Sequence, residues 1–543
     1  MKLSRNSKPT VIVICSVVHA LSVCAVIGLC ALCVPANNQK ALRQARSALR
    51  SGDFQRAEQL YREVLQKNDE EFEAHLGLSK TLLKQQRLQE SFEHAARVIA
   101  ANPLSAEAHA ILGSAILATG DFRLSLEEFR TALNIDDDQA MAVAGLALID
   151  FYENRNNDAV QKLRRAVSMD PNEPDYVFSL GQAAARAEKY KEAADAYERF
   201  LTIAPHTDAD RRARIRGLID FLRYLGRQSS LYNVSGPERT VVTFESVDNR
   251  PIVNVRLNGS KTPLRFVLDT GSGMSVISEE TARRLGLRPV ARGGMARAIG
   301  GGGRFEIVYG YLNSMDLGDI HIENVPIYIR RFYDQQTPVD GYLGIAALVR
   351  LVTAVDYGTR RMTLVRQRNS ADLSSLIDRI ATTPSTNVVA RPGFEILVRT
   401  TSSGFLSGEV SIEGITKSLN FIIDTGATVS VISQRAAALE PFAEFIQPDR
   451  MRVFGAAGVT EDVKMAMLPK LAIGSYARER VNAAVLDLDP INETAGFQQN
   501  GILGGNFLRH FRVVFDFQRG ILRFEPIDGS KPKNAATQEK SGL

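Results

Sequence analysis

The sequence predicts a multidomain protein: an apolar N-terminal helix, then an all-α array of repeated helix pairs, then a mainly-β domain of two related lobes. Three observations lead to this. The run Thr10–Val34 has no charged side chain, a pattern of small residues returns every 34 positions, and an Asp-Thr-Gly turn occurs twice in the C-terminal half. A length of 543 residues also exceeds what one hydrophobic core organises, so separate domains are expected.

Composition excludes several classes of function. Apolar content of 45% and charged content of 23% are ordinary for a globular protein. A net charge of +5 without a basic block does not predict a nucleic-acid partner. The four cysteines all lie within the first 33 residues, so the rest of the chain has no thiol for a disulfide, a zinc site or a nucleophile. The histidines lack metal-ligand spacing, and neither a metal nor a cofactor is expected.

Residues 1–36 are predicted to form a signal anchor. A helix of the length of Thr10–Val34, at 1.5 Å per residue, exceeds the ~30 Å hydrocarbon core of a bilayer. The short basic lead favours a single-pass topology with the remainder of the chain on the periplasmic or extracytoplasmic side, although basic residues also follow the segment. Val34-Pro35-Ala36 resembles a cleavage site, so a removed signal peptide is the alternative.

A strict period of 34 residues follows the apolar run. Gly-Asp-Phe at 52–54 returns at 120–122, and three related tripeptides keep the same register. Small residues recur at two fixed points of each repeat: Ala45, Ser79, Gly113, Ala147 and Gly181, and Ala57, Ser91, Ser125, Ala159 and Ala193. Small side chains let paired helices approach closely, and a Pro or Asp near each repeat end stops the second helix.

This pattern resembles the tetratricopeptide repeat (TPR) family, with five copies and a capping helix in residues 37–228. The aromatic residue usual in the first helix is absent. Asp208–Gln228 is amphipathic, as expected of a helix that covers the apolar end of an array. Such arrays present a groove to a peptide or protein, so a protein partner is expected there; a spacer between membrane and C-terminal domain is the alternative.

The C-terminal half reads as a duplicated β-domain. Short β-branched runs punctuated by glycine predict strands. The stretch FVLDTGSGMSVIS at Phe266–Ser278 returns as FIIDTGATVSVIS at Phe421–Ser433, and both copies continue with a glycine-rich cluster and a Leu-Gly pair in the same order. The expected bounds are lobe 1 at 237–368, a linker at 369–390, lobe 2 at 391–528 and a disordered tail at 529–543.

Two copies of the turn have a chemical rationale. An apolar strand that runs into Asp-Thr-Gly places a carboxylate on a tight turn, where glycine leaves room for a neighbouring chain. Two carboxylates held ~3 Å apart cannot both ionise, so they share one proton. One can then deprotonate a water for attack on a peptide carbonyl while the other protonates the carbonyl oxygen. The duplication therefore predicts that Asp269 and Asp424 meet.

Residues 237–527 resemble the aspartic proteases, and each half is similar to a retropepsin-like lobe. The resemblance is carried by Asp269-Thr270-Gly271-Ser272 and Asp424-Thr425-Gly426-Ala427, with Tyr342-Leu343-Gly344 and Ile502-Leu503-Gly504 downstream. It implies that Asp269 and Asp424 are the catalytic pair, that Thr270 and Thr425 bond across the loops, and that their neighbours support them. It also implies flap tips at two glycine clusters, which comprise Gly300, Gly301, Gly302 and Gly303 in lobe 1 and Gly455 and Gly458 in lobe 2.

The sequence thus predicts a membrane-anchored aspartic endopeptidase that needs neither metal nor cofactor, acts on protein or peptide substrates and recruits them or other partners through the TPR array. The alternative is a TPR adaptor whose duplicated domain binds peptides without cleaving them. Retention of Asp, Thr and Gly in both copies favours the enzyme. Pairing of the lobes within one chain is preferred over pairing between chains, because the linker can span adjoining lobes.

Overall fold

The computed structural model describes residues 36–299, 303–334, 337–366 and 393–527. The apolar run Thr10–Val34, the predicted linker and the predicted tail lie outside those ranges. Within the described ranges, no helix combines the length and the apolar character that a membrane span requires. The chain divides into two compact units, residues 1–112 and 113–543, and the division falls inside helix α6.

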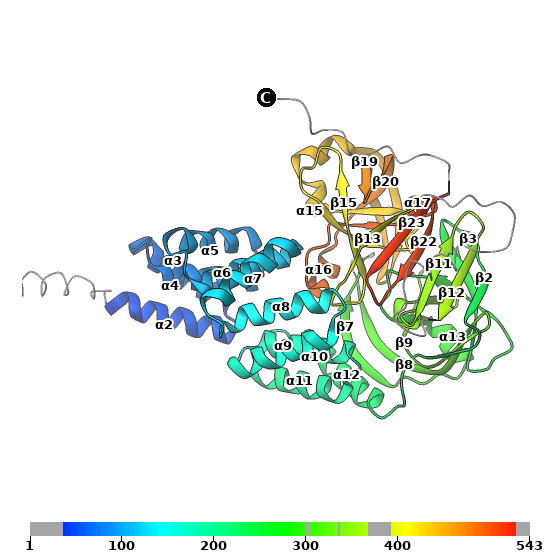
Figure 1. Ribbon diagram of the computed structural model, residues 1–543, viewed down its shortest axis with the longest axis horizontal. Helices are drawn as coiled ribbons and strands as arrows, with labels where there is room; N and C mark the ends of the chain where they lie inside the picture. Colours follow the sequence, from blue (N-terminus) through cyan, green and yellow to red (C-terminus); the bar gives the residue numbers. More distant parts are fainter. Residues whose placement is uncertain (1–35, 300–302, 335–336, 367–392, 528–543) are drawn as a thin grey trace, which may run out of the picture. The chain divides into compact units, whose positions relative to one another are not determined.

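The N-terminal part of the described chain is a series of paired helices (Figure 1). The second helices of the pairs begin at intervals of 34 residues, from Phe54 to Tyr190, as the sequence period predicts. The helices are α2 Ala36–Ser51, α3 Phe54–Lys67, α4 Phe72–Lys84, α5 Leu88–Ala101, α6 Ala106–Thr119, α7 Phe122–Ile135, α8 Ala140–Tyr152, α9 Asn156–Met169, α10 Pro174–Arg186, α11 Tyr190–Ile203 and α12 Ala209–Leu225.

The recurring Gly-Asp-Phe tripeptide is a helix junction. Gly52 and Gly120 have φ angles of 79° and 87°, in the left-handed region that glycine enters without strain. The aspartate that follows is the N-cap, and its carboxylate accepts from the backbone N–H three residues on, as Asp53 does from Arg56. Helix α12, the last of the array, begins similarly, because the Asp208 carboxylate accepts a hydrogen bond from the N–H of Arg211.

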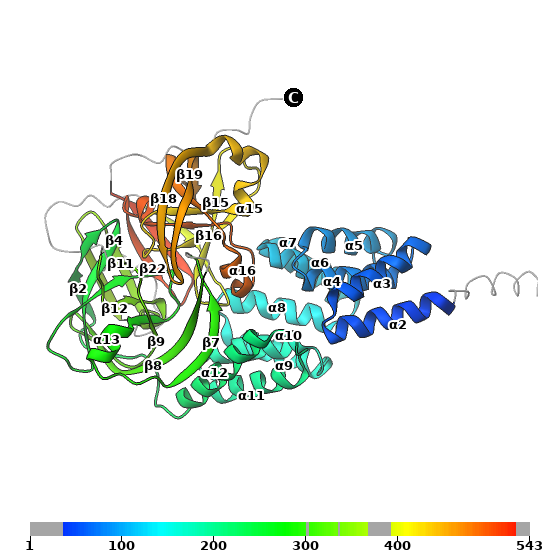
Figure 2. The same ribbon diagram turned by 180° about the vertical axis from the view of Figure 1, so that it is seen from behind.

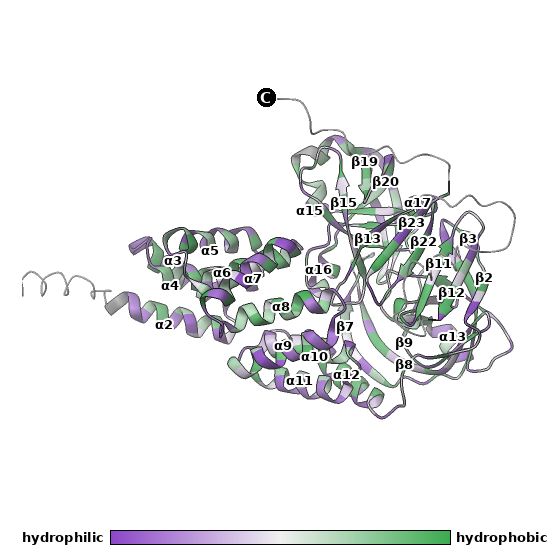
Figure 3. Ribbon diagram, in the orientation of Figure 1, coloured by the Kyte–Doolittle hydropathy of each residue, from purple (hydrophilic) through white to green (hydrophobic). Residues whose placement is uncertain are grey.

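Small residues lie where the helices touch. In the first unit, Ser79 and Ser91 are both fully buried, and the Ser79 hydroxyl donates to the Ser91 carbonyl at 2.6 Å. In the second unit, a Cβ on Gly145 would lie 2.2 Å from the Phe129 ring. A larger side chain at such a position would force the helices apart. Figure 3 shows α8, which carries Gly145, as mostly hydrophobic along its length.

The β-domain consists of two lobe sheets and one shared sheet. Lobe 1 contains β1 Asn233–Ser235, β3 Glu245–Val247, β4 Arg250–Leu257, β5 Leu264–Leu268, β6 Ser275–Ser278, β7 Ala291–Arg297, β8 Arg304–Leu317, β9 Ile320–Arg330 and β10 Gly341–Leu343. Lobe 2 contains β14 Arg399–Thr400, β15 Leu406–Ile412, β16 Leu419–Ile423, β17 Ser430–Ser433, β18 Ile446–Gly455, β19 Gly458–Ile473, β20 Tyr476–Leu486 and β21 Gly501–Leu503. Short helices follow several strands: α13 Glu279–Arg284, α15 Gln434–Ala437, α16 Asp489–Ala495 and α17 Gly505–Leu508.

The shared sheet joins the lobes. Its order is β13-β23-β22-β11-β12-β2, so strands that close lobe 1 pair directly with strands that close lobe 2. The strands are β2 Arg239–Thr243, β11 Leu351–Asp356, β12 Arg361–Arg366, β13 Phe394–Leu397, β22 Phe511–Asp516 and β23 Ile521–Pro526 (Figure 1). Asp356 and Asp516 shape the two closing hairpins by accepting backbone N–H bonds from the turns.

The lobes repeat one strand arrangement around each Asp-Thr-Gly turn. In lobe 1, β10 runs parallel to β5 with Gly341 opposite Phe266; in lobe 2, β21 runs parallel to β16 with Gly501 opposite Phe421. Each is also antiparallel to the strand that follows its turn, β6 or β17. The sequence duplication is therefore a structural duplication.

The second half of the helical array packs against both lobes within the second unit. On lobe 2, Phe122 and Tyr152 make edge contacts with Phe497 at 5.0 and 5.1 Å between ring centroids. On lobe 1, α12 lies along β7 (Figure 2), and Phe221 of α12 stacks on Tyr309 at 4.3 Å. From Gly113 onward, the helical array therefore packs directly against both lobes.

Candidate active site

Two equivalent turns carry Asp269 and Asp424. Each follows a buried strand, β5 or β16, and each aspartate N–H donates to the carbonyl of the neighbouring strand, Leu343 or Leu503, at 3.0 Å. The strands predicted from Tyr342-Leu343-Gly344 and Ile502-Leu503-Gly504 therefore lie directly beside the aspartate turns. The preceding strand and the hydrogen bond to the neighbouring strand together fix the backbone from which each carboxylate projects.

The two turns are bonded to each other through their threonines. The Thr270 hydroxyl donates to the Ile423 carbonyl at 2.7 Å and accepts from the Thr425 N–H at 3.0 Å. The Thr425 hydroxyl does the reverse, donating to Leu268 at 2.7 Å and accepting from Thr270 N–H at 3.2 Å. Both threonines are buried, so these bonds are costly to leave unmade. The lobes pair within one chain.

Glycine at the third position of each turn permits the two aspartates to approach. A Cβ on Gly271 would lie 2.5 Å from the Asp424 carboxylate, and a Cβ on Gly426 would lie 2.6 Å from Asp269 Oδ1. Each glycine N–H also donates to the carboxylate of its own turn, at 2.9 Å for Asp269 and 2.7 Å for Asp424. Any other side chain here would push the carboxylates apart.

Burial raises the pKa of both carboxyls, and the pKa of Asp424 stands well above its usual range because it is buried beside the charge of Asp269. The two groups share a hydrogen bond and titrate as a pair. The pair is asymmetric. The Ser272 hydroxyl donates to Asp269 Oδ2 at 2.5 Å and favours the charge there, whereas Ala427 at the matched place has no hydroxyl.

Comparison with known families agrees with this geometry. Residues 253–347 and 408–507 match the family model described as aspartyl protease, and 42–102, 80–140 and 145–207 match the tetratricopeptide repeat model. The β-domain is a retropepsin-like aspartyl protease domain, and it is fused to tetratricopeptide repeats.

Solved structures similar to parts of the chain are distant. An aspartic proteinase from Irpex lacteus is 15% identical, with 53% of this chain and 97% of that chain covered and a TM-score of 0.35. A thermophilic TPR protein from Thermus thermophilus is 21% identical, with 34% and 98% covered and a TM-score of 0.29. No curated protein matches the chain in sequence.

The glycine clusters of the protease domain lie at hairpins. Strands β7 and β8 pair antiparallel around the first cluster, in which Gly303 is described and Gly300–302 lie outside the described residues. In lobe 2, Gly455 ends β18 and Gly458 begins β19, where its φ of 139° suits glycine. Both hairpins occur where flaps were expected from the sequence.

The lobe-1 hairpin reaches lobe 2. Arg297, the last residue of β7, pairs with Glu493 of α16. Ile299 packs against the apolar cluster beside Asp424, which includes Leu486 and Ile502. The base of this hairpin is also fastened to the repeats, because a guanidinium N–H of Arg214 in α12 donates to the Met295 carbonyl at 2.9 Å.

One residue near the dyad was missed by sequence reasoning. Arg330 ends β9, its guanidinium carbon lies 5.4 Å from the ring centroid of Phe305, and its charge lowers the pKa of Asp269. Its Nε is buried and has no hydrogen-bond partner among the described residues. An arginine at the end of an apolar strand was the available signal, but only the strand register places it on the side of the aspartates.

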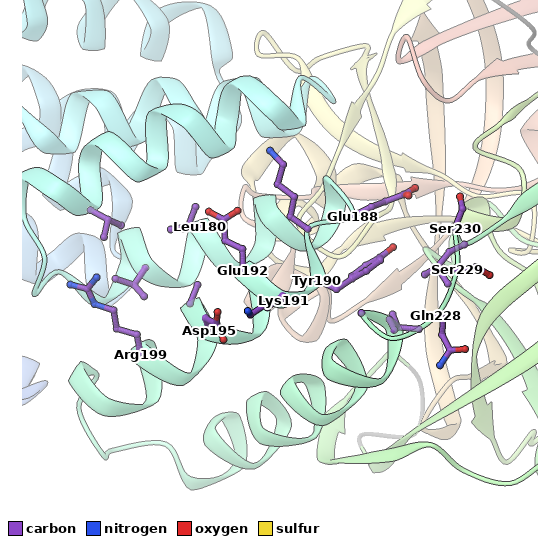
Figure 4. Close-up of a pocket in the computed structure, with 17 residues that line it drawn as sticks. Leu180, Glu188, Tyr190, Lys191, Glu192, Asp195, Arg199, Gln228, Ser229 and Ser230 are labelled. Atoms are coloured by element: carbon purple, nitrogen blue, oxygen red, sulfur yellow. The ribbon is translucent and has the colours of Figure 1, made fainter.

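Outside the aspartate turns, the described residues form a pocket but no group of side chains that could bind a metal ion. A hollow of about 750 Å³ lies among α9, α10 and α11 and the segment after α12, and Figure 4 shows Tyr190, Lys191 and Asp195 on its wall. Its lining contains neither aspartate turn. Across the described residues, no three His, Cys, Asp or Glu side chains are grouped as a metal ion requires.

Proposed function

We propose that this protein is an aspartic endopeptidase that hydrolyses peptide bonds with a water activated by Asp269 and Asp424. The observation that carries the proposal is the pair itself: two carboxyls with raised pKa values, on turns fixed against each other by reciprocal threonine bonds. An aspartate on an isolated surface turn does not require threonine bonds to a second turn. Two carboxyls that share one proton do require such bonds, because they must be held close together.

We propose the two roles at the start of the reaction from the hydrogen bonds that each carboxyl accepts. Asp269 accepts bonds from Ser272 and Gly271 and is the ionised base that takes a proton from water. Asp424, whose pKa is raised further, is the acid that protonates the carbonyl oxygen. The resulting tetrahedral diol loses the amine after a proton returns to the nitrogen, and the pair again holds one proton.

The test is peptide hydrolysis by the full-length chain on a mixed peptide library from pH 3 to 7, beside Asp269→Asn and Asp424→Asn. Both variants are expected to lose at least about 10²–10⁴-fold in rate, because each removes one partner of the acid–base pair. Asp137→Asn, at an exposed position in the repeats, is the matched control and keeps the parent rate. Activity that survives either dyad variant would sink the proposal.

A folded but inert parent that still binds peptides would instead support the adaptor, in which the protease domain has a binding role only. Ala427 in place of a second hydroxyl is one departure of the dyad from symmetry, and the pH profile of hydrolysis measures its effect.

The repeats are proposed to recruit protein substrates or partners, and residues 10–34 to anchor the chain in a membrane with the protease domain on the extracytoplasmic side. Recruitment rests on the TPR match, and anchoring rests on the sequence alone. If the repeats recruit protein substrates through the hollow of Figure 4, Lys191→Glu should slow cleavage of a protein but not of a short peptide.

The membrane anchor is tested by co-sedimentation with membranes. The full-length chain should sediment with them, and a chain that begins at residue 37 should not.

A further inference from the structure

The two lobes present different side chains beside the dyad. In lobe 2, the strands next to Asp424 contribute a buried, wholly apolar cluster. Its members on the four strands around the turn are Ile422, Val431, Ala484, Leu486 and Ile502. Ala427 of the aspartate turn and Ile299 of the lobe-1 hairpin pack against this cluster, so it lies between the dyad and that hairpin.

Strand register identifies the matched residues of lobe 1. Ser278 and Ser433 each stand nine positions after their aspartate, and they pair with Arg330 and Leu486 on the next strand. The same matching relates Tyr342 to Ile502, because each stands in the middle of the short strand beside its turn. Where lobe 2 has leucine and isoleucine, lobe 1 therefore has a guanidinium and a phenol.

Arg330 has no ion-pair partner among the residues that the structure describes. Within those residues it also makes no side-chain hydrogen bond, although its Nε is buried. The nearby Arg250, in contrast, pairs with Asp334 at 3.3 Å. The guanidinium of Arg330 lies over Phe305, in the strand that leaves the lobe-1 hairpin, and its charge acts on Asp269. It thus stands between the dyad and that hairpin, as Leu486 does in lobe 2.

A guanidinium whose buried Nε has no hydrogen-bond partner is costly, and a guanidinium fork fits a carboxylate with two parallel hydrogen bonds. We propose that Arg330 is a specificity-determining residue that binds an aspartate or glutamate side chain of the substrate on the lobe-1 side of the scissile bond, while the Leu486 side takes an apolar side chain. This inference rests on the proposed function and names its substrate class: peptides with an acidic and an apolar residue flanking the cleaved bond.

The competing role for Arg330 is as a counter-charge that only tunes the dyad. The two roles differ in what they change. A carboxylate-binding residue sets KM for acidic peptides and leaves neutral peptides alone. A counter-charge changes kcat and the acidic limb of the pH profile for every peptide equally, because it acts through Asp269.

The experiment uses the full-length chain and one peptide scaffold with Glu, Gln or Leu at the two positions on each side of the cleaved bond. The parent is expected to show a KM about 10-fold lower for Glu than for Gln at one position, the value of one charge-assisted contact. Arg330→Leu, which copies the lobe-2 residue, loses this preference, and Arg330→Lys keeps part of it. Arg283→Leu, at an exposed position of α13, is the matched control and keeps the preference for Glu.

Equal changes for Glu and Gln peptides in Arg330→Leu, with a shifted pH profile, would overturn the proposal. If no peptide is cleaved, the proposed function fails separately, and fluorescence anisotropy of the same labelled peptides decides the inference. Tighter binding of Glu than Gln, lost in Arg330→Leu and retained in Arg330→Lys, supports it. Equal binding of both peptides by the parent contradicts it.

Discussion

Ser272 and Ala427 make the two halves of the dyad chemically different, although the turns around them are nearly identical. A hydroxyl that donates to a carboxylate stabilises the ionised form, and Asp269 receives such a bond while Asp424 does not. Duplication supplies the geometry of the pair, and the hydroxyl at this position, together with the charge of Arg330, favours the ionised form of Asp269.

The first prediction concerns the pH profile. Removing the Ser272 hydroxyl raises the pKa of Asp269, so Ser272→Ala should move the acidic limb of kcat/KM, where the pair takes its second proton, about one unit to higher pH. Ala427→Ser should add a donor to Asp424 and lower its pKa, which moves the alkaline limb to lower pH. Peptide hydrolysis across pH measures both. An unmoved acidic limb in Ser272→Ala would count against the assigned charge.

At the scale of the elements, one position of the repeat shows how a motif and its exceptions arise. The residue two before each second helix adopts positive φ in all five pairs: Gly52 at 79°, Gln86 at 61°, Gly120 at 87°, Asn154 at 62° and Glu188 at 59°. The helix junction requires a residue in the left-handed region at this position, and only two of the five copies have glycine there. The other three carry a strain that their surroundings tolerate.

The second prediction follows from that strain. Gln86 is exposed, so Gln86→Gly should raise the free energy of unfolding by about 1 kcal/mol. Gly120→Ala at the matched place should lower it by about 2 kcal/mol, because an added Cβ would also lie 2.1 Å from Asn420 Nδ2 and 3.2 Å from Phe497 Cδ2. Urea unfolding measures both. The same sign for the two changes would refute the argument.

At the scale of the molecule, the repeats from Gly113 onward support the protease domain. Arg186, the last residue of α10, has its guanidinium carbon 3.8 Å from the centre of the Phe151 ring, and desolvation of the guanidinium lowers its pKa to about 10, so it stays charged at neutral pH. It donates to the Thr401 carbonyl at 2.6 Å and to its two neighbours. That loop continues to Ser403, whose carbonyl approaches Gly273 of the lobe-1 aspartate turn.

The third prediction is that Arg186→Met costs about 3 kcal/mol in the unfolding of the second unit, since three loop carbonyls lose a charged donor. Arg199→Met is the control. Arg199 is exposed and donates one bond to the Pro171 carbonyl, so its loss should cost about 0.5 kcal/mol or less. Denaturation curves of both variants decide. Equal costs would mean that the repeats and lobe 2 unfold independently.

Several features of the fold and of the candidate site follow from local patterns. The 34-residue period predicted the spacing of the helix pairs, because each pair repeats the same caps and small contacts. The paired turns predicted that Asp269 and Asp424 meet, since the chain holds two copies of one strand-turn unit. Arg330 was not foreseen, because its place depends on β9 pairing in parallel with β6, a contact between strands distant in sequence.

What the sequence by itself determined is therefore the repeated unit: the helix junctions and the aspartate turns, which depend on residues close together in the chain. Tertiary structure alone decided how those units combine. The shared sheet that joins the lobes, the packing of α12 against β7 and the position of Arg330 near the dyad arise from packing between distant segments. Local propensity does not encode such contacts, because their free energy depends on partners that only the folded chain brings together.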